Sequence, residues 1–99
     1  MKYSVRLLSV AEEDLASILD YISVDNHIAA HKLLESFEDK LELLKDNPLL
    51  GKLPADETLK EFGYRYLVVS SYLVFYVIRS HDVVVHRILH GARNYLELI

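Results

Sequence analysis

The chain of 99 residues has the length of one small domain, and it contains no cysteine, so disulfides, thiolate metal sites and thiol nucleophiles are excluded. Its formal charge of −4 is unevenly spread: residues 1–62 carry thirteen Asp/Glu and seven Lys/Arg, whereas residues 63–99 carry two acids and four arginines. Nucleic-acid affinity depends on a basic surplus, so only the C-terminal part offers a surface of that kind, and a small one.

No segment of the sequence predicts membrane insertion or export. The longest apolar run, residues 72–78, is far shorter than the roughly 20 residues that span a bilayer. The N-terminus also lacks a basic segment followed by an apolar one, because three acids follow directly at residues 12–14. We therefore expect a single cytoplasmic domain over residues 1–99, without membrane contact.

The N-terminal part predicts a short strand followed by a helix. Residues 2–8 alternate polar and apolar side chains imperfectly, which indicates a strand. Ser9 and Glu12 fit the S-x-x-E capping box, so a helix should begin at Ser9. Apolar residues then recur at helical spacing, namely Ala11, Leu15, Ile18 and Ile22, with Leu19 widening the stripe.

A second amphipathic helix is predicted over residues 27–45. Asp25 and Asn26 interrupt the first pattern and can cap this helix, and Pro48 ends it because proline disfavours the helical conformation of the preceding residue. The short link predicts an antiparallel helical hairpin. The apolar stripe of the second helix consists of Ala30, Leu33, Leu34, Phe37, Leu41 and Leu44.

Three strands are predicted in the C-terminal part, at residues 64–69, 73–79 and 83–89. The joints between them are short enough for hairpins, so these strands should run antiparallel in sequence order. The middle strand is apolar at both alternations, which indicates a central strand covered on both faces. Residues 58–62 form either a turn of helix or an irregular segment, and residues 93–99 form a short tail.

The sequence resembles the RelE/ParE superfamily of small bacterial toxins, and within it the ParE branch. The resemblance covers nearly the whole chain and is carried by Tyr64-Arg65-Tyr66-Leu67-Val68-Val69, Tyr72-Leu73-Val74-Phe75-Tyr76 and Arg87-Ile88-Leu89-His90-Gly91-Ala92-Arg93. It implies an α+β fold with an N-terminal strand, a helical hairpin and a three-stranded antiparallel meander, in the order β-α-α-β-β-β, with a short C-terminal tail. It also implies the toxin of a type II toxin-antitoxin, or plasmid stabilisation, system with a cognate antitoxin as partner.

The superfamily contains two modes of action. RelE-like members are ribosome-dependent mRNA endonucleases, whereas ParE-like members poison DNA gyrase and have no established catalytic residues. The basic positions of the nuclease branch fall here on Tyr64, Tyr66, Leu73 and Arg93, of which only Arg93 is basic. We therefore expect gyrase binding rather than catalysis, and no cofactor. The alternatives are an mRNA endoribonuclease that acts on the ribosome with His90, Arg87 and Arg93, and a non-toxic protein-binding module.

Cationic residues near the last strand are the candidate target-binding residues: Arg93, His90 and Arg87, together with Arg65. His90 and Arg93 flank Gly91, where the chain leaves the sheet, and site residues concentrate at such loops. Turn capping explains these two residues equally well. Arg87 lies within a strand, so it either belongs to an anionic-ligand site or pairs with a carboxylate or backbone carbonyls.

Two helices can cover only one face of a sheet. The other face should then leave tyrosine, valine and leucine side chains open to water, and such an apolar surface usually marks a partner site. On this interpretation Tyr66, Tyr72 and Phe75 contact the antitoxin. The alternative is that residues 48–62 or the tail fold over this face.

The histidines do not predict a metal site. Four residues along a strand place His86 and His90 roughly 13 Å apart, too far to share one ion. His27 and His31 are one helical turn apart, but they lack a convincing third ligand besides Glu35. The oligomeric state stays open between a dimer and a heterocomplex with the antitoxin.

Overall fold

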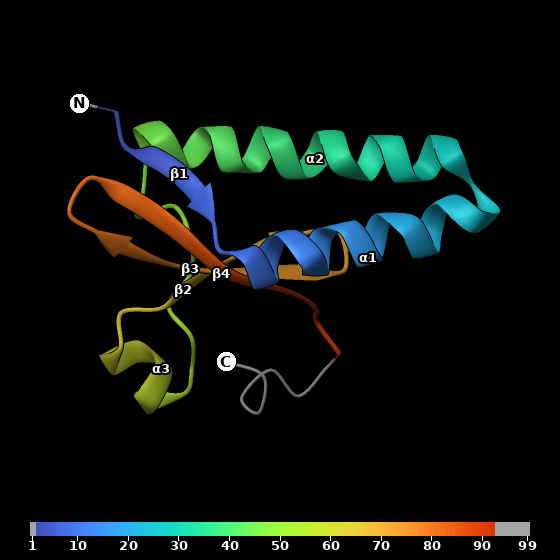
Figure 1. Ribbon diagram of the computed structural model, residues 1–99. Helices are drawn as coiled ribbons and strands as arrows, with labels where there is room; N and C mark the ends of the chain where they lie inside the picture. The colour runs from blue at the N-terminus through green and yellow to red at the C-terminus, as the bar shows by residue number, and fades with distance from the viewer. Residues whose placement is uncertain (1, 93–99) are drawn as a thin grey trace.

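The computed structural model describes residues 2–92, in which a helical hairpin packs on one face of a four-stranded sheet (Figure 1). This α+β arrangement confirms the predicted order of elements. The predicted tail, residues 93–99, lies outside the described residues. The elements are β1 (Ser4–Leu7), α1 (Ser9–Asp25), α2 (His27–Asp46), α3 (Glu57–Glu61), β2 (Arg65–Val69), β3 (Tyr72–Arg79) and β4 (Asp82–His90).

The strands lie in the order β1-β4-β3-β2. The last three form the predicted antiparallel meander. The pairing of the N-terminal strand was left open by the sequence, and the structure pairs β1 parallel to β4, with Ser4 opposite Asp82 and Leu7 opposite Val85. Because β1 is short, it covers only the first part of β4.

The start of α1 differs from the predicted capping box. Leu8 occupies the N-cap position in an extended conformation, and no side chain caps the helix. The reason is the neighbouring sheet: the Leu8 amide donates to the Val85 carbonyl at 2.9 Å, which holds Leu8 extended. Ser9 therefore enters the helix as its first residue, so the prediction of its capping role is wrong, although the helix begins where predicted.

The other helix starts follow the predicted chemistry of capping side chains. Asn26 accepts a hydrogen bond from the Ala29 amide at 3.0 Å and caps α2, as predicted. Asp56 accepts one from the Leu59 amide at 3.0 Å and caps α3. Within residues 2–92, no helix combines the length and the apolar character that crossing a bilayer requires.

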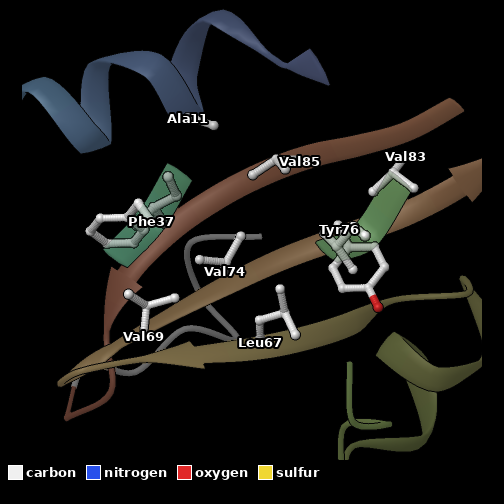
Figure 2. Packing of buried hydrophobic residues seen from close by; sticks show 10 residues of the cluster. Ala11, Phe37, Leu67, Val69, Val74, Tyr76, Val83 and Val85 are labelled. Atoms are coloured by element: carbon white, nitrogen blue, oxygen red, sulfur yellow. The ribbon is translucent and has the colours of Figure 1, made fainter. Parts of the chain in front are cut away.

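The main core lies between the helical hairpin and the sheet (Figure 2). Ala11, Phe37 and Leu44 of the helices are fully buried against the facing side of the strands. The Phe37 ring lies 6.1 Å from the Tyr72 ring, centroid to centroid. The strand residues of this core are Leu67, Val69, Val74, Tyr76, Val83, Val85 and Ile88.

Much of the opposite face of the sheet is also buried, although Val68 on this face is 46% exposed. Phe75, Val77, Val84 and Leu89 alternate with the core residues along their strands, and each is only 1–3% exposed. The short helix α3 lies on this side of the sheet (Figure 1), where Leu59 is buried. The expectation of an uncovered apolar face is therefore wrong for these residues, and α3, within residues 48–62, supplies part of the cover.

Candidate functional site

Arg87 is paired with a carboxylate from the first helix. Its Nε and Nη2 atoms donate to Oδ2 and Oδ1 of Asp14 at 2.7 and 2.9 Å, and the Ile88 amide donates to the same carboxylate at 3.0 Å. The hydrogen bond that Arg87 donates to Asp14 raises the pKa of Arg87, so the guanidinium stays charged. The structural alternative for Arg87 is thus confirmed, because a carboxylate already occupies its planar fork.

Arg65 holds a loop. Its Nη1 atom donates to the Gly51 carbonyl at 2.9 Å, next to the point where Lys52 pairs with Tyr66. Arg65 lies opposite Tyr76 in the sheet, whereas His90 lies opposite Tyr72, four residues away along β3. That separation is roughly 13 Å along the strand, so the structure does not bring Arg65 and His90 into one site.

His90 lies at the end of β4 with its ring exposed. Its Nδ1 atom accepts a hydrogen bond from the Ala92 amide at 3.1 Å, and its ring meets Tyr72 edge-on at 5.4 Å. The turn-capping role is therefore present, while the exposed ring keeps His90 accessible to a partner. Arg93, the other candidate at this end of the sheet, lies outside the described residues.

The three residues assigned to the antitoxin differ in position. Tyr72 lies on the hairpin side of the sheet and packs against Phe37. Phe75 is 1% exposed on the opposite side. Tyr66 is partly buried beside Phe75, with the two ring centroids 6.0 Å apart. The isolated chain therefore offers neither Tyr72 nor Phe75 as an exposed contact, because Tyr72 packs against the helical hairpin and the chain buries Phe75.

The structure instead exposes an apolar surface where α1 ends and α2 begins. Tyr21, Val24 and Ile28 are 80%, 84% and 69% exposed. We call these three residues the hairpin-tip patch. The tip of the hairpin extends past the strands (Figure 1), so no strand lies beneath it. The sequence could have indicated this patch, because its three apolar residues lie outside the predicted apolar stripes of the two helices.

A second apolar surface combines the loop after α2 with the outer strand β2. Leu49, Leu50 and Leu53 of the loop and Val68 of β2 are exposed, and we call these four residues the edge patch. Leu50 and Val68 line a shallow hollow together with Lys40 and Lys52. An apolar patch flanked by lysines at the edge of a sheet suits an acidic partner with apolar side chains.

The outer edge of β2 is partly unpaired. Lys52 exchanges two backbone hydrogen bonds with Tyr66, at 2.8 and 2.9 Å. Val68 lies two residues further, so its backbone N–H and C=O point to the same outer side as those of Tyr66. An edge strand of this kind is a template for pairing with an extended segment.

Comparison with known proteins agrees with the fold and with the sequence resemblance. A sequence profile described as the ParE toxin of the type II toxin-antitoxin system, parDE, matches residues 5–95. A chain from the chromosomal ParDE system of P. aeruginosa is similar in structure, with a TM-score of 0.72 and 18% identity, covering 90% of this chain and 96% of that chain.

A chain from the toxin-antitoxin complex RelBE2 of Mycobacterium tuberculosis has a TM-score of 0.61 and 26% identity, covering 91% of this chain and 99% of that chain. No curated protein matches the sequence. The two solved structures support the RelE/ParE-like fold, and the profile spans most of the chain. The chain therefore belongs to the family of ParE toxins of type II toxin-antitoxin systems.

Proposed function

We propose that this ParE-like toxin acts by binding DNA gyrase and that a cognate antitoxin neutralises it. The observation that carries the proposal is the match of the ParE toxin profile over residues 5–95. The structural neighbours come from a ParDE system and from a toxin-antitoxin complex. The partners of those proteins are not transferred to this chain directly. We infer a cognate antitoxin for this chain from the shared family.

The positions of the cationic residues support binding over catalysis. Cleavage of a phosphodiester without a metal needs a proton acceptor, a proton donor and cations that converge on one phosphate. Here Arg87 is bonded to Asp14, and Arg65 is bonded to a loop carbonyl. Arg65 is also separated from His90 by roughly 13 Å along the sheet, so the described candidates are dispersed.

We assign gyrase contact to the end of β4, where His90 is exposed. Arg93 follows closely in the sequence, and its assignment rests on the sequence alone. We expect Arg93→Ala to abolish growth arrest while the melting temperature stays nearly unchanged. A large fall in melting temperature would instead assign Arg93 a structural role.

We assign the antitoxin to the edge patch. That surface combines exposed leucines, an unpaired strand edge beside Val68 and the two cations Lys40 and Lys52. An extended antitoxin segment can add a strand there and place apolar and acidic side chains on the toxin. The hairpin-tip patch is also apolar, but its helical backbone offers no open edge for strand pairing.

A gyrase supercoiling assay tests the target. We expect the purified chain to inhibit supercoiling, and we expect the antitoxin encoded in a neighbouring reading frame to restore it. Growth arrest with unchanged supercoiling would remove gyrase as the target. Primer extension on translating ribosomes then tests the nuclease alternative, which mRNA cleavage lost in His90→Ala would support. Absence of growth arrest on induction of the chain alone would support the non-toxic module.

A further inference from the structure

A cavity of about 410 Å³ lies between α3 and the sheet. The helix α3 lies on the face opposite the helical hairpin (Figure 1). Its volume falls within the range of small-molecule sites, about 300–1,000 Å³. Leu59 and Phe62 line it from α3 and the residue that follows, and Val77 lines it from β3. Phe62 is 69% exposed, so a ligand in the cavity would find a large apolar side chain available.

The polar wall of the cavity is built by Tyr64 and His86. The Tyr64 hydroxyl and His86 Nδ1 lie 3.0 Å apart, and the two rings meet edge-on with centroids separated by 5.2 Å. His86 stands at a shift in the β3–β4 register, between the pairs Phe75–Arg87 and Tyr76–Val85. Such bulges redirect a side chain out of the regular ladder.

Burial sets the protonation states of Tyr64 and His86. Burial raises the pKa of the Tyr64 hydroxyl, so the hydroxyl keeps its proton at neutral pH. Burial, with smaller effects of Arg79 and Arg6, lowers the pKa of His86, so the ring is neutral. The Tyr64 hydroxyl and the neutral His86 ring therefore share an uncharged hydrogen bond.

Arg79 is the cationic side chain of the cavity. Arg79 lines the cavity and takes part in no ion pair with any of residues 2–92. Asp56 also lines the cavity, where its carboxylate caps α3 by accepting from the Leu59 amide. Asp82, opposite Arg79 in the ladder, accepts a hydrogen bond from the Ser4 hydroxyl. Lys60 and Glu57 on α3 pair with each other. The guanidinium thus remains available to a ligand.

We propose that this cavity binds a small organic carboxylate with an aromatic or aliphatic body. Arg79 pairs with the carboxylate, because a guanidinium presents two parallel donors to such a group. Leu59, Phe62 and Val77 contact the apolar body. The site lies apart from the His90 end of the sheet and from the edge patch, so it does not depend on the proposed gyrase or antitoxin contacts.

Indole-3-acetate and its neutral isostere indole-3-acetamide form a matched pair of probes. The chain contains no tryptophan, so the fluorescence anisotropy of either indole can be followed without interference from protein indole. We expect saturable binding of indole-3-acetate and about tenfold weaker binding of the amide, since a charged hydrogen bond contributes about 1.5–3 kcal/mol. Equal affinity for acid and amide, or no saturation by indole-3-acetate at low millimolar concentration, would overturn the proposal.

Two substitutions localise the site on the folded chain. Arg79→Gln should weaken indole-3-acetate about tenfold and leave the amide unchanged, whereas Phe62→Ala should weaken both probes. Both residues are exposed, so circular dichroism should report unchanged folding. Lys32→Gln on α2 removes the same charge from the other side of the sheet and serves as the control. Indole-3-acetate binding that is unaffected by Arg79→Gln, or weakened equally by Lys32→Gln, would refute the site.

Discussion

Asp14 and Arg87 stand 73 residues apart in the sequence and are joined by two parallel hydrogen bonds. The same carboxylate accepts the Ile88 amide, on the part of β4 that lies beyond the pairing with β1. Asp14 therefore accepts a backbone hydrogen bond at the edge of β4 and also balances the charge of Arg87. This geometry explains how a basic residue within an apolar strand is accommodated without a ligand.

Removing either partner should destabilise the fold, and by different amounts. Asp14→Ala leaves both Arg87 and the Ile88 amide without this acceptor, so we expect a loss of about 2–4 kcal/mol in the free energy of unfolding. Arg87→Ala leaves the Ile88 hydrogen bond in place, so the loss should be smaller, about 1–3 kcal/mol. Urea denaturation measures both values, with the exposed neighbour Glu13→Ala as control. A larger loss in Arg87→Ala would contradict this order.

Tyr76 holds the loop after α2 against the sheet. Its ring is fully buried, and its hydroxyl donates to the Pro48 carbonyl and accepts from the Gly51 amide, both at 2.8 Å. Tyr76→Phe should lower the free energy of unfolding by about 1–3 kcal/mol, because the buried Gly51 amide and the partly buried Pro48 carbonyl lose their partner. The exposed Tyr21→Phe is the matched control and should change stability little. Equal effects of the two substitutions would argue against the loop contact.

Gly51 is required by the same close packing. A Cβ at this position would lie 2.5 Å from the Tyr76 hydroxyl oxygen and 2.9 Å from the Tyr66 carbonyl oxygen. Gly51→Ala should therefore displace the loop and cost about 1–3 kcal/mol, measured by thermal unfolding. In the Tyr76→Phe background the cost should be smaller but not zero, because the ring carbon Cε1, 2.7 Å from the added Cβ, and the backbone oxygen of Tyr66 still block the site. An additive double variant would show that the two residues act independently.

The order and bounds of the elements could be predicted because their signals are local. Helical spacing located the two long helices, Asn26 marked the cap of α2, and the short serine-containing joints separated the strands. The parallel pairing of β1 with β4 could not be predicted, since it joins the two ends of the described chain. The failure at Ser9 has the same origin, because a long-range bond from Leu8 to Val85 moved the cap by one residue.

The candidate site was predicted less well than the fold. Arg87 and Arg65 were correctly placed on strands, but their partners, Asp14 and the Gly51 carbonyl, are remote in sequence and carry no local pattern. Phe75 was expected on an open face, yet the chain buries it. The edge patch depends on which strand is outermost, and that follows only from the complete sheet order.

Lowering the pH should destabilise the chain through His86. Burial lowers the pKa of His86 in the folded state below its ordinary value of 6.5, so the unfolded chain binds the proton more readily. The contribution of the neutral ring is therefore present above pH 6.5 and is lost as the pH falls through that value towards the folded pKa. We expect the free energy of unfolding to fall between about pH 7 and pH 5, and to fall less in His86→Gln.

The control for this pH effect is His27→Gln, at an exposed position on α2. It should leave the pH dependence of the wild-type chain nearly unchanged. A proton NMR titration of the imidazole signals provides a direct check, in which the His86 resonance should titrate below 6.5. A slope that is the same in His86→Gln as in the wild type would show that other groups cause the effect.

Antitoxin affinity should depend on the exposed Val68 and not on the exposed Val24. Val68→Glu places a carboxylate in the edge patch, where the partner strand would bury it, so we expect antitoxin affinity to fall about 30-fold or more. Val24→Glu makes the same change in the hairpin-tip patch and should alter affinity little. Calorimetric titration of each toxin variant with the antitoxin measures both effects, and urea denaturation checks that the variants stay folded. If Val24→Glu lowers antitoxin affinity more than Val68→Glu does, the antitoxin site should be assigned to the helical hairpin instead of the outer strand.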